Sequence, residues 1–509
     1  MGQWVEKNLG GGRLDLPLFC SKVFKRTRSS QMVAFHSGLV ATAFIAGALA
    51  AEPIKLHPEN PHYFLWRGKP TVLIGSGEHY GALLNLDFDF ERYFAALARD
   101  GLNHTRTFSG TYREVPGSFG ITDNTLAPQP GRYLAPWARS DQPGYYDGGN
   151  KFDLTRFDPR YFERLKRFMT TASKYGVVVE FNLFCPLYED ELWQASPMNA
   201  RNNVNGIGDC ARDEVLTLKH PDLVEVQVAF VRRVVEELNE FDNFYFEVCN
   251  EPYVRNVPWD WQEKMIETIV QAEKQLPKKH LISLNIANGS KKVERLHPAV
   301  SILNFHYCTP PDAVAWNYHW NCVIGENETG FRGREDIIYR TEAWEFIVAG
   351  GALFSHLDYS FTCAHPEGTF REYKSPGGGS PELRQQLGIL KRFVESFDFI
   401  PMKPLPEALH RKPDGLNVRI LGEMGRAYAI YLCVPIPAKP KNLQEHLRED
   451  IQTELELHLP PGVYYGEWIS PVSGEIAKSC TIASQGGAVK LQTPVFDNAI
   501  ALRLVRKGQ

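Results

Sequence analysis

The sequence predicts an α/β protein: a (β/α)8 TIM barrel followed by a small all-β sandwich domain. Three observations lead to this prediction. From Pro53 to Ile400, short apolar segments alternate with amphipathic helices, which is typical of a parallel sheet. Eight apolar segments can be counted, the number that closes a barrel. After Pro401, short strands separated by turns replace the alternation.

The eight predicted strands each precede a helix or a loop. They are Thr71–Gly75, Leu102–Phe108, Val177–Phe184, the run from Phe244 to Asn250-Glu251-Pro252, Leu281–Ile286, Ser301–Tyr307, Cys322–Glu328 and Ala352–Phe361. The clearest predicted helices are Asp89–Asp100, Pro159–Tyr175, Pro221–Leu238 and Pro381–Phe397. Long segments at 110–153 and 186–215 follow the second and third strands. We expect them to be substrate-binding loops on the catalytic face of the barrel.

Three segments of the chain have distinct characters. We expect residues 1–51 to be a targeting segment, 52–400 a catalytic barrel and 401–509 a β-sandwich accessory domain. Nothing in the last segment has the pattern of a catalytic site. We interpret it as a structural accessory packed on the barrel, with carbohydrate binding as the alternative.

The N-terminal segment resembles an export signal. The apolar run Met32–Ala51 ends in Ala48-Leu49-Ala50, a small-x-small cleavage pattern, and follows the basic residues Lys22, Lys25, Arg26 and Arg28. We expect an exported protein, periplasmic or extracellular, with no stable membrane insertion after the signal is removed. An uncleaved anchor is the alternative, weakened by His36, Ser37 and Gly38. Met32 could also be the true start.

The composition of the chain limits the classes of partner and cofactor that we expect. Hydrophobic residues make up 43% and charged residues 23%, as in a soluble globular protein. A net charge of −4 gives no reason to expect nucleic acid as a partner. The nine cysteines form no C-x-x-C pair, so we expect no metal, no cofactor and mostly free thiols, although a disulfide stays open. The sequence does not indicate an oligomeric state.

Glu251 is the first candidate for a catalytic residue. The apolar run from Phe244 ends in Asn250-Glu251-Pro252, and proline cannot continue a sheet ladder. Glu251 therefore lies at the carboxyl end of a strand, where parallel barrels assemble their active sites.

A second carboxylate at the end of a later strand would lie near Glu251, because the carboxyl ends of all barrel strands meet on one face, and paired carboxylates can perform acid/base chemistry. Glu326 and Glu328 both lie in Cys322–Gly330. Residues two apart on a strand share a face, so both could point inward. We favour Glu328, because the glycine at 330 lets the chain turn away; Glu326 stays open as the alternative.

Together these strand ends resemble clan A glycoside hydrolases, whose fourth barrel strand ends in Asn-Glu-Pro. The resemblance covers Tyr63 to Phe399 and implies an acid/base role for Glu251 and a nucleophile at Glu328. It also implies that Arg106, ending Gly101–Arg106, binds the nucleophile. By the same resemblance Tyr307, in Phe305-His306-Tyr307, contacts the nucleophile, and Asn250 binds the sugar 2-hydroxyl.

Three further residues are candidates for substrate binding: Glu78 and His79 after the first strand, and His306 on the sixth. A structural role is the alternative for each. The segment Ser76–Gly81 also resembles a little-characterised group of exported bacterial cellulase-like proteins. The tryptophan that the clan often places at the end of the eighth strand is missing after Leu357, which leaves the shape of the first sugar site open.

The sequence thus predicts an exported retaining glycoside hydrolase acting on a poly- or oligosaccharide by double displacement. A catalytically inactive carbohydrate-binding barrel is the alternative. A metal-dependent barrel hydrolase is disfavoured, because the first strand carries Glu78-His79-Tyr80 and not a His-x-His pair. The substrate glycan, its linkage and endo or exo action stay open.

Overall fold

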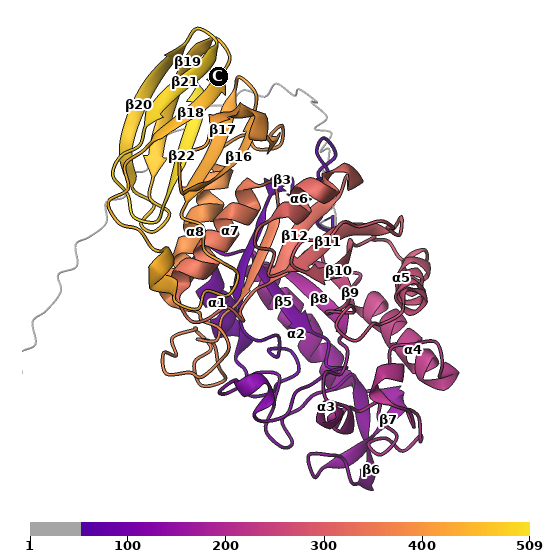
Figure 1. The fold of residues 1–509 in the computed structure, drawn as a ribbon. Coiled ribbons are helices and arrows are strands. Elements are labelled where there is room, and N and C mark those ends of the chain that lie inside the picture. The colour runs from indigo at the N-terminus through magenta and orange to yellow at the C-terminus, as the bar shows by residue number, and fades with distance from the viewer. Residues whose placement is uncertain (1–51, 509) are drawn as a thin grey trace, which may run out of the picture. The chain divides into compact units, whose positions relative to one another are not determined.

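The computed structural model describes residues 52–508, and the predicted targeting segment 1–51 lies outside this range. Within it, eight parallel strands form a closed barrel in the order β10-β11-β12-β13-β4-β5-β8-β9 (Figure 1). These strands are β4 (Leu73–Gly77), β5 (His104–Phe108), β8 (Val178–Phe184), β9 (Phe244–Cys249), β10 (Ile282–Asn288), β11 (Val300–His306), β12 (Val323–Glu328) and β13 (Leu353–Leu357). The predicted fold class is confirmed.

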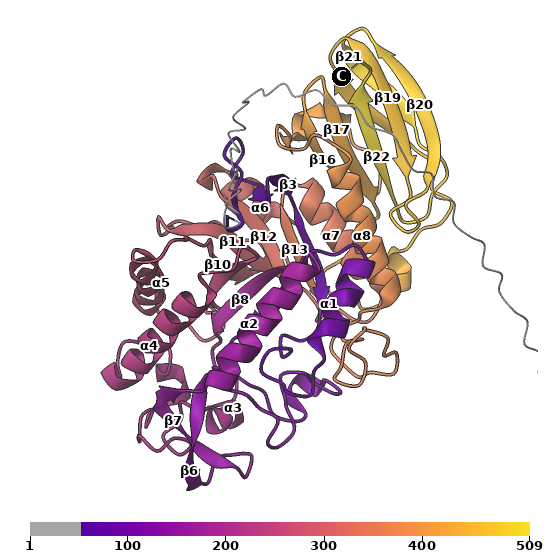
Figure 2. The ribbon, with the colours of Figure 1, turned by 180° about the vertical axis from the view of Figure 1, so that it is seen from behind.

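Helices follow all the barrel strands except β10. They are α1 (Phe90–Arg99), α2 (Pro159–Lys174), α4 (Pro221–Leu238), α5 (Trp259–Glu273), α7 (Asp336–Val348) and α8 (Pro381–Glu395), with the short α6 (Asp312–Asn317) and η3 (Tyr318–Trp320) after β11. Figure 2 shows α1 and α2 side by side on the outer face of the strands. In α1, Phe90, Tyr93, Phe94 and Leu97 form the buried stripe, and the Asp89 side chain accepts hydrogen bonds from the first free amides.

A small antiparallel sheet precedes the barrel and was not predicted. It consists of β1 (Lys55–Leu56), β2 (Phe64–Trp66) and β3 (Lys69–Thr71). Strands of two or three residues are too short to show an alternating pattern, so the sequence carries no periodic signal for them.

The two long segments after β5 and β8 contain regular structure of their own. The first holds η1 (Ser118–Gly120) and a hairpin of β6 (Trp137–Pro143) and β7 (Asn150–Phe157). The second holds α3 (Asp190–Ala195) and η2 (Arg212–Glu214). The hairpin was not predicted, because its register shifts twice and so breaks the period-two pattern.

The C-terminal part is an all-β domain, as predicted. Six antiparallel strands form one sheet: β14 (Lys403–Pro404), β16 (Asn417–Glu423), β17 (Ala427–Cys433), β22 (Ala499–Arg506), β19 (Gly462–Ile469) and β20 (Ile476–Ser484). Three form another: β15 (Leu409–Arg411), β18 (Glu454–Leu459) and β21 (Gly487–Gln492), with η4 (Pro406–Ala408) and η5 (Leu443–His446) as short connections. Sequence reasoning missed β20, an edge strand with few buried residues.

This domain packs on α7 of the barrel. Trp344 stacks on Tyr431 with ring centroids 5.2 Å apart, and Arg419 pairs with the buried Glu345 at 3.2 Å. Within the described residues all eight cysteines are free thiols, as the sequence favoured. None of the described helices is both long and apolar enough to span a membrane.

Candidate active site

A cavity of about 350 Å³ opens at the carboxyl ends of the barrel strands and holds two of the predicted carboxylates. Its lining residues come from the barrel loops and the C-terminal domain: His79, Tyr80, Phe108, Tyr112, Glu114, Phe119, Leu126, Tyr188, Asn250, Glu251, Asn288, Tyr307, Glu328, Phe331, Arg332, Ala438 and Lys439. This is the barrel face on which enzymes of this fold place their active sites.

Glu251 and Glu328 face each other across His306. The imidazole Nδ1 of His306 lies 3.2 Å from Glu251 and 3.4 Å from Glu328. One donor atom from each of the three residues lies within 4.8 Å of the other two. Glu251 follows β9 with φ of 37°, in the left-handed region that non-glycine residues rarely adopt. Strain of this kind is concentrated at functional sites.

Glu328 is held by three hydrogen-bond donors. Arg106 Nη1 and the Tyr80 hydroxyl donate to its Oε2, each at 3.0 Å, and the Tyr307 hydroxyl donates to Oε1 at 2.8 Å. Burial raises the pKa of both tyrosines well above its usual value, so the phenols stay protonated and donate. A guanidinium and two hydroxyls thus hold both oxygens of Glu328 in place by hydrogen bonds.

Glu251 is bound by a histidine and a tyrosine. The Tyr188 hydroxyl donates to its Oε2 at 2.8 Å, and His306 contacts Oε1. Burial by itself raises the pKa of Glu251, but the hydrogen bonds and charge of His306 and the bond from Tyr188 outweigh it and leave the pKa below its usual value. The two carboxylates therefore share the imidazole of His306 but differ in their other neighbours, because only Glu328 also pairs with the guanidinium of Arg106.

Glu326 lies outside the cavity, although it is two residues from Glu328 on the same strand. Its Oε1 accepts from the backbone N–H of Cys308 at 2.7 Å, and the side chain is fully buried. Burial, together with the nearby Glu342, raises its pKa well above the usual value. The register shift between β11 and β12 at this point places the two glutamates against different partners.

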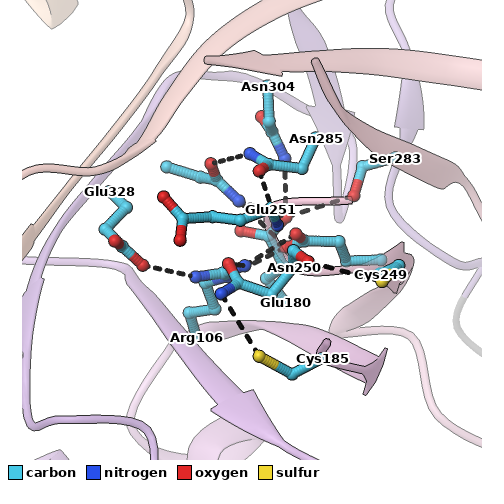
Figure 3. Close-up of polar contacts among 12 residues, drawn as sticks. Arg106, Glu180, Cys185, Cys249, Asn250, Glu251, Ser283, Asn285, Asn304 and Glu328 are labelled. Atoms are coloured by element: carbon cyan, nitrogen blue, oxygen red, sulfur yellow. Dashed lines mark hydrogen bonds and ion pairs between the residues drawn. The ribbon is translucent and has the colours of Figure 1, made fainter. Parts of the chain in front are cut away.

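Arg106 connects the cavity to a polar network inside the barrel (Figure 3). Its Nη2 donates to Asn250 Oδ1 and to Glu247 Oε1, both at 2.6 Å, and its Nε donates to Glu247 Oε2 at 2.8 Å. In the same network, burial and the nearby Glu247 raise the pKa of Glu180 well above its usual value. The predicted position of Arg106 beside Glu328 agrees with this geometry. Asn250 lines the cavity and also donates to the Tyr188 hydroxyl at 2.8 Å.

Glu78 and His79 lie in different places. The Glu78 carboxylate is buried outside the cavity lining and accepts from the backbone N–H groups of Gly81 and Ala82 at 2.9 and 3.0 Å, which fixes the turn after β4. His79 lines the cavity and pairs with Glu114 at 3.2 Å. Although burial lowers its pKa, the charge of Glu114 and its hydrogen bond outweigh this effect and raise it.

Glu251, His306 and Glu328 offer a donor set that could hold a cation, namely two carboxylates and one imidazole. The surroundings oppose this role. The guanidinium of Arg106 lies 3.0 Å from Glu328 and would repel a cation, and both oxygens of Glu328 already accept hydrogen bonds. The donor set fits proton transfer and nucleophilic chemistry better than metal binding.

Several lining residues were not predicted, among them Tyr80, Glu114, Tyr188 and Phe331. Tyr188 and Glu114 lie on long loops whose paths the sequence pattern does not define. Tyr80 could have been found from the sequence, because it directly follows the candidate His79 at the end of a predicted strand. In the structure Tyr80 has a φ of 56°.

Neither family models nor curated protein sequences match this sequence. Similar solved structures do exist. A candidate glycoside hydrolase from Bacteroides vulgatus superposes with a TM-score of 0.61 at 13% identity, covering 91% of this chain and 83% of that chain. A glycoside hydrolase family 5 protein from the same organism gives 0.58 at 11% identity, covering 90% and 94%. A third structure, named as a glycoside hydrolase, gives 0.59 at 12% identity, covering 90% and 98%.

At identities this low, the superpositions establish the fold only. The activity has to be argued from the residues of the site. The chain has the barrel fold of glycoside hydrolases, family 5 among them.

Proposed function

We propose that this protein is a retaining glycoside hydrolase that cleaves O-glycosidic bonds of a poly- or oligosaccharide. The observation that carries the proposal is the pair Glu251 and Glu328, whose facing oxygens lie within 4.8 Å of each other in one cavity. Retaining enzymes place their carboxyl groups about 5–5.5 Å apart, whereas inverting enzymes need about 6.5–9.5 Å to admit a water. Export of the chain, indicated by residues 1–51, is part of the same proposal.

In the first step Glu328 attacks the anomeric carbon. The bond to the leaving oxygen breaks as the protonated Glu251 transfers its proton to that oxygen, and a glycosyl ester forms on Glu328. Arg106 and Tyr307 orient Glu328 through hydrogen bonds before the attack.

In the second step Glu251, now a carboxylate, takes a proton from water. The resulting hydroxide equivalent attacks the anomeric carbon and breaks the ester, which frees Glu328 and releases the sugar with its original anomeric configuration. His306 lies between the two carboxylates and so can stabilise whichever one carries the charge.

A panel of aryl and oligomeric glycosides tests the proposal. We expect turnover by the wild type that falls by about 100- to 10,000-fold in Glu251→Gln and in Glu328→Gln. Glu326→Gln, a glutamate on the same strand but outside the cavity, is the matched control and should keep its activity. NMR of the first product formed should show the anomer of the substrate.

Two results would contradict the proposal. Binding of glycans without turnover would identify an inactive carbohydrate-binding barrel. An initial product of inverted configuration would contradict the double-displacement mechanism.

A further inference from the structure

The cavity that holds Glu251 and Glu328 is small. Its lining comes from the ends or loops of seven of the eight barrel strands, all except β13, and from a segment of the C-terminal domain. Its volume of about 350 Å³ lies near the lower end of the range for ligand pockets, about 300–1,000 Å³. A cavity of this size has room for few sugars, whereas an enzyme that cuts inside a polysaccharide binds several sugars along a groove.

The wall on the Glu328 side is built by His79, Tyr80 and Glu114. Tyr80 donates to Glu328 at 3.0 Å, the rings of Tyr80 and His79 lie 5.8 Å apart, and His79 pairs with Glu114 at 3.2 Å. This row of contacts ends in the loop after β5, so that this loop borders the cavity on the side of Glu328.

Glu114 lines the cavity and is held by three side chains. It is 2% exposed, accepts from the Tyr112 hydroxyl at 3.1 Å and from Asn124 at 2.5 Å, and shares His79 Nε2 between its two oxygens at 3.2 and 3.3 Å. A sugar hydroxyl in the cavity can bind Glu114 by replacing one of the two His79 contacts.

Phe119 crosses the mouth of the cavity. Its ring lies 5.6 Å from Tyr188 and 6.2 Å from Phe331, in edge-to-face contacts that join the loops after β5, β8 and β12. At 38% exposed, it presents an apolar ring to solvent. An exposed aromatic ring beside a sugar site offers a stacking surface for the sugar's C–H face.

The remaining wall belongs to the C-terminal domain. Arg332, buried in the loop after β12, pairs with Glu342 at 2.7 Å and donates to the carbonyls of Ala438 at 2.6 Å and Pro437 at 3.1 Å. These bonds hold Ala438 and Lys439 against the cavity.

We infer that this cavity is a chain-end site, which releases one sugar at a time from the non-reducing end of a glycan. The inference rests on the proposed function. The sugar attacked by Glu328 lies on the walled side, so nothing can be attached beyond it; the leaving group departs past Glu251. Glu114 binds a hydroxyl of that terminal sugar.

Product analysis tests the inference. The panel first identifies a sugar whose aryl monoglycoside the protein cleaves. Oligosaccharides of that sugar, in several lengths, then carry a fluorescent label at the reducing end. We expect labelled chains to shorten by one residue at each step, with free monosaccharide as the earliest product. Labelled fragments of several lengths at the earliest time would overturn the chain-end site while leaving the proposed function intact. No turnover of any glycoside would overturn both.

Variants of one loop test the role of Glu114. Glu114→Gln should lower kcat/KM for the aryl monoglycoside about tenfold or more, mainly through a higher KM, because one charged acceptor is lost. Asp123→Asn removes a charge from the same loop outside the cavity and should leave both constants unchanged. Thermal melting confirms that both variants fold. Equal kinetics in the two variants would overturn the assignment of Glu114.

Discussion

Arg106 contacts the polar network of the barrel interior as well as Glu328, the proposed nucleophile. Its guanidinium is 1% exposed and contacts Glu247, Asn250 and Glu328 at once. A buried charge of this kind is tolerated only because each of its partners is satisfied.

Arg106→Met should therefore cost about 3–5 kcal/mol of unfolding free energy, because Glu247 would be left buried and unpaired. Urea denaturation measures the loss. The exposed pair of Arg371 and Glu382 provides the control, and Arg371→Met should cost about 1 kcal/mol or less. Similar losses in the two variants would contradict the network.

The lowered pKa of Glu251 leads to a prediction about the pH dependence of activity. Its folded pKa is below the usual value, and acid catalysis needs the protonated form, so activity should fall as pH rises through this low pKa. Tyr188→Phe removes a donor to the ionised form, which should raise the pKa and move the falling limb of kcat/KM to higher pH.

The pH profile of kcat/KM on an aryl glycoside measures this shift. Tyr146→Phe is the matched control, because the Tyr146 hydroxyl donates to Glu191 at an exposed site outside the cavity. A shift in the Tyr146 variant, or none in the Tyr188 variant, would argue against the assignment of Glu251 as the acid.

Helices and strands of the barrel were predictable where an amphipathic or apolar segment was flanked by helix caps or turns. The predicted helix Pro221–Leu238 has the bounds of α4, since proline starts it and its apolar face repeats at helical spacing. Arg106, in the middle of β5, and Tyr307, directly after β11, were predictable for another reason: both lie on or next to a predicted strand, whose direction points toward the carboxyl face of the barrel.

Side chains from the long loops were not predictable. Glu114 and Phe119 reach the cavity through turns with positive φ at Gly117, Phe119 and Gly120, and no periodic pattern encodes such a path. The choice between Glu326 and Glu328 depended on a register shift between β11 and β12, which only the paired strand reveals.

The cap of α1 supports a prediction about one helix. Asp89 Oδ1 accepts from the backbone N–H groups of Glu91 and Arg92 at 3.1 and 3.2 Å. Asp89→Ala should lower the unfolding free energy by about 1 kcal/mol, whereas Asp89→Asn keeps an acceptor and should cost less. Thermal melting of the two variants compares them, and equal losses would show that the cap contributes little.

The barrel and the all-β domain share buried contacts, so we expect the molecule to unfold in one step. Burial raises the pKa of Glu345 on α7, and Arg419 of the all-β domain is its cationic partner. Calorimetry should show a single transition, and Arg419→Met should lower its midpoint. Two separate transitions would mean that the domains are energetically independent.

The bonds from Arg332 to Pro437 and Ala438 also limit how this architecture can be recombined. A carbohydrate-binding module that only tethers an enzyme to its polymer can be exchanged for another without changing the chemistry. Here the C-terminal domain supplies part of the wall beside Glu251 and Glu328, so under the proposed function we expect a foreign domain in its place to leave these carboxylates in a more open site. Under the same proposal, we expect substitutions in either domain to change glycan specificity.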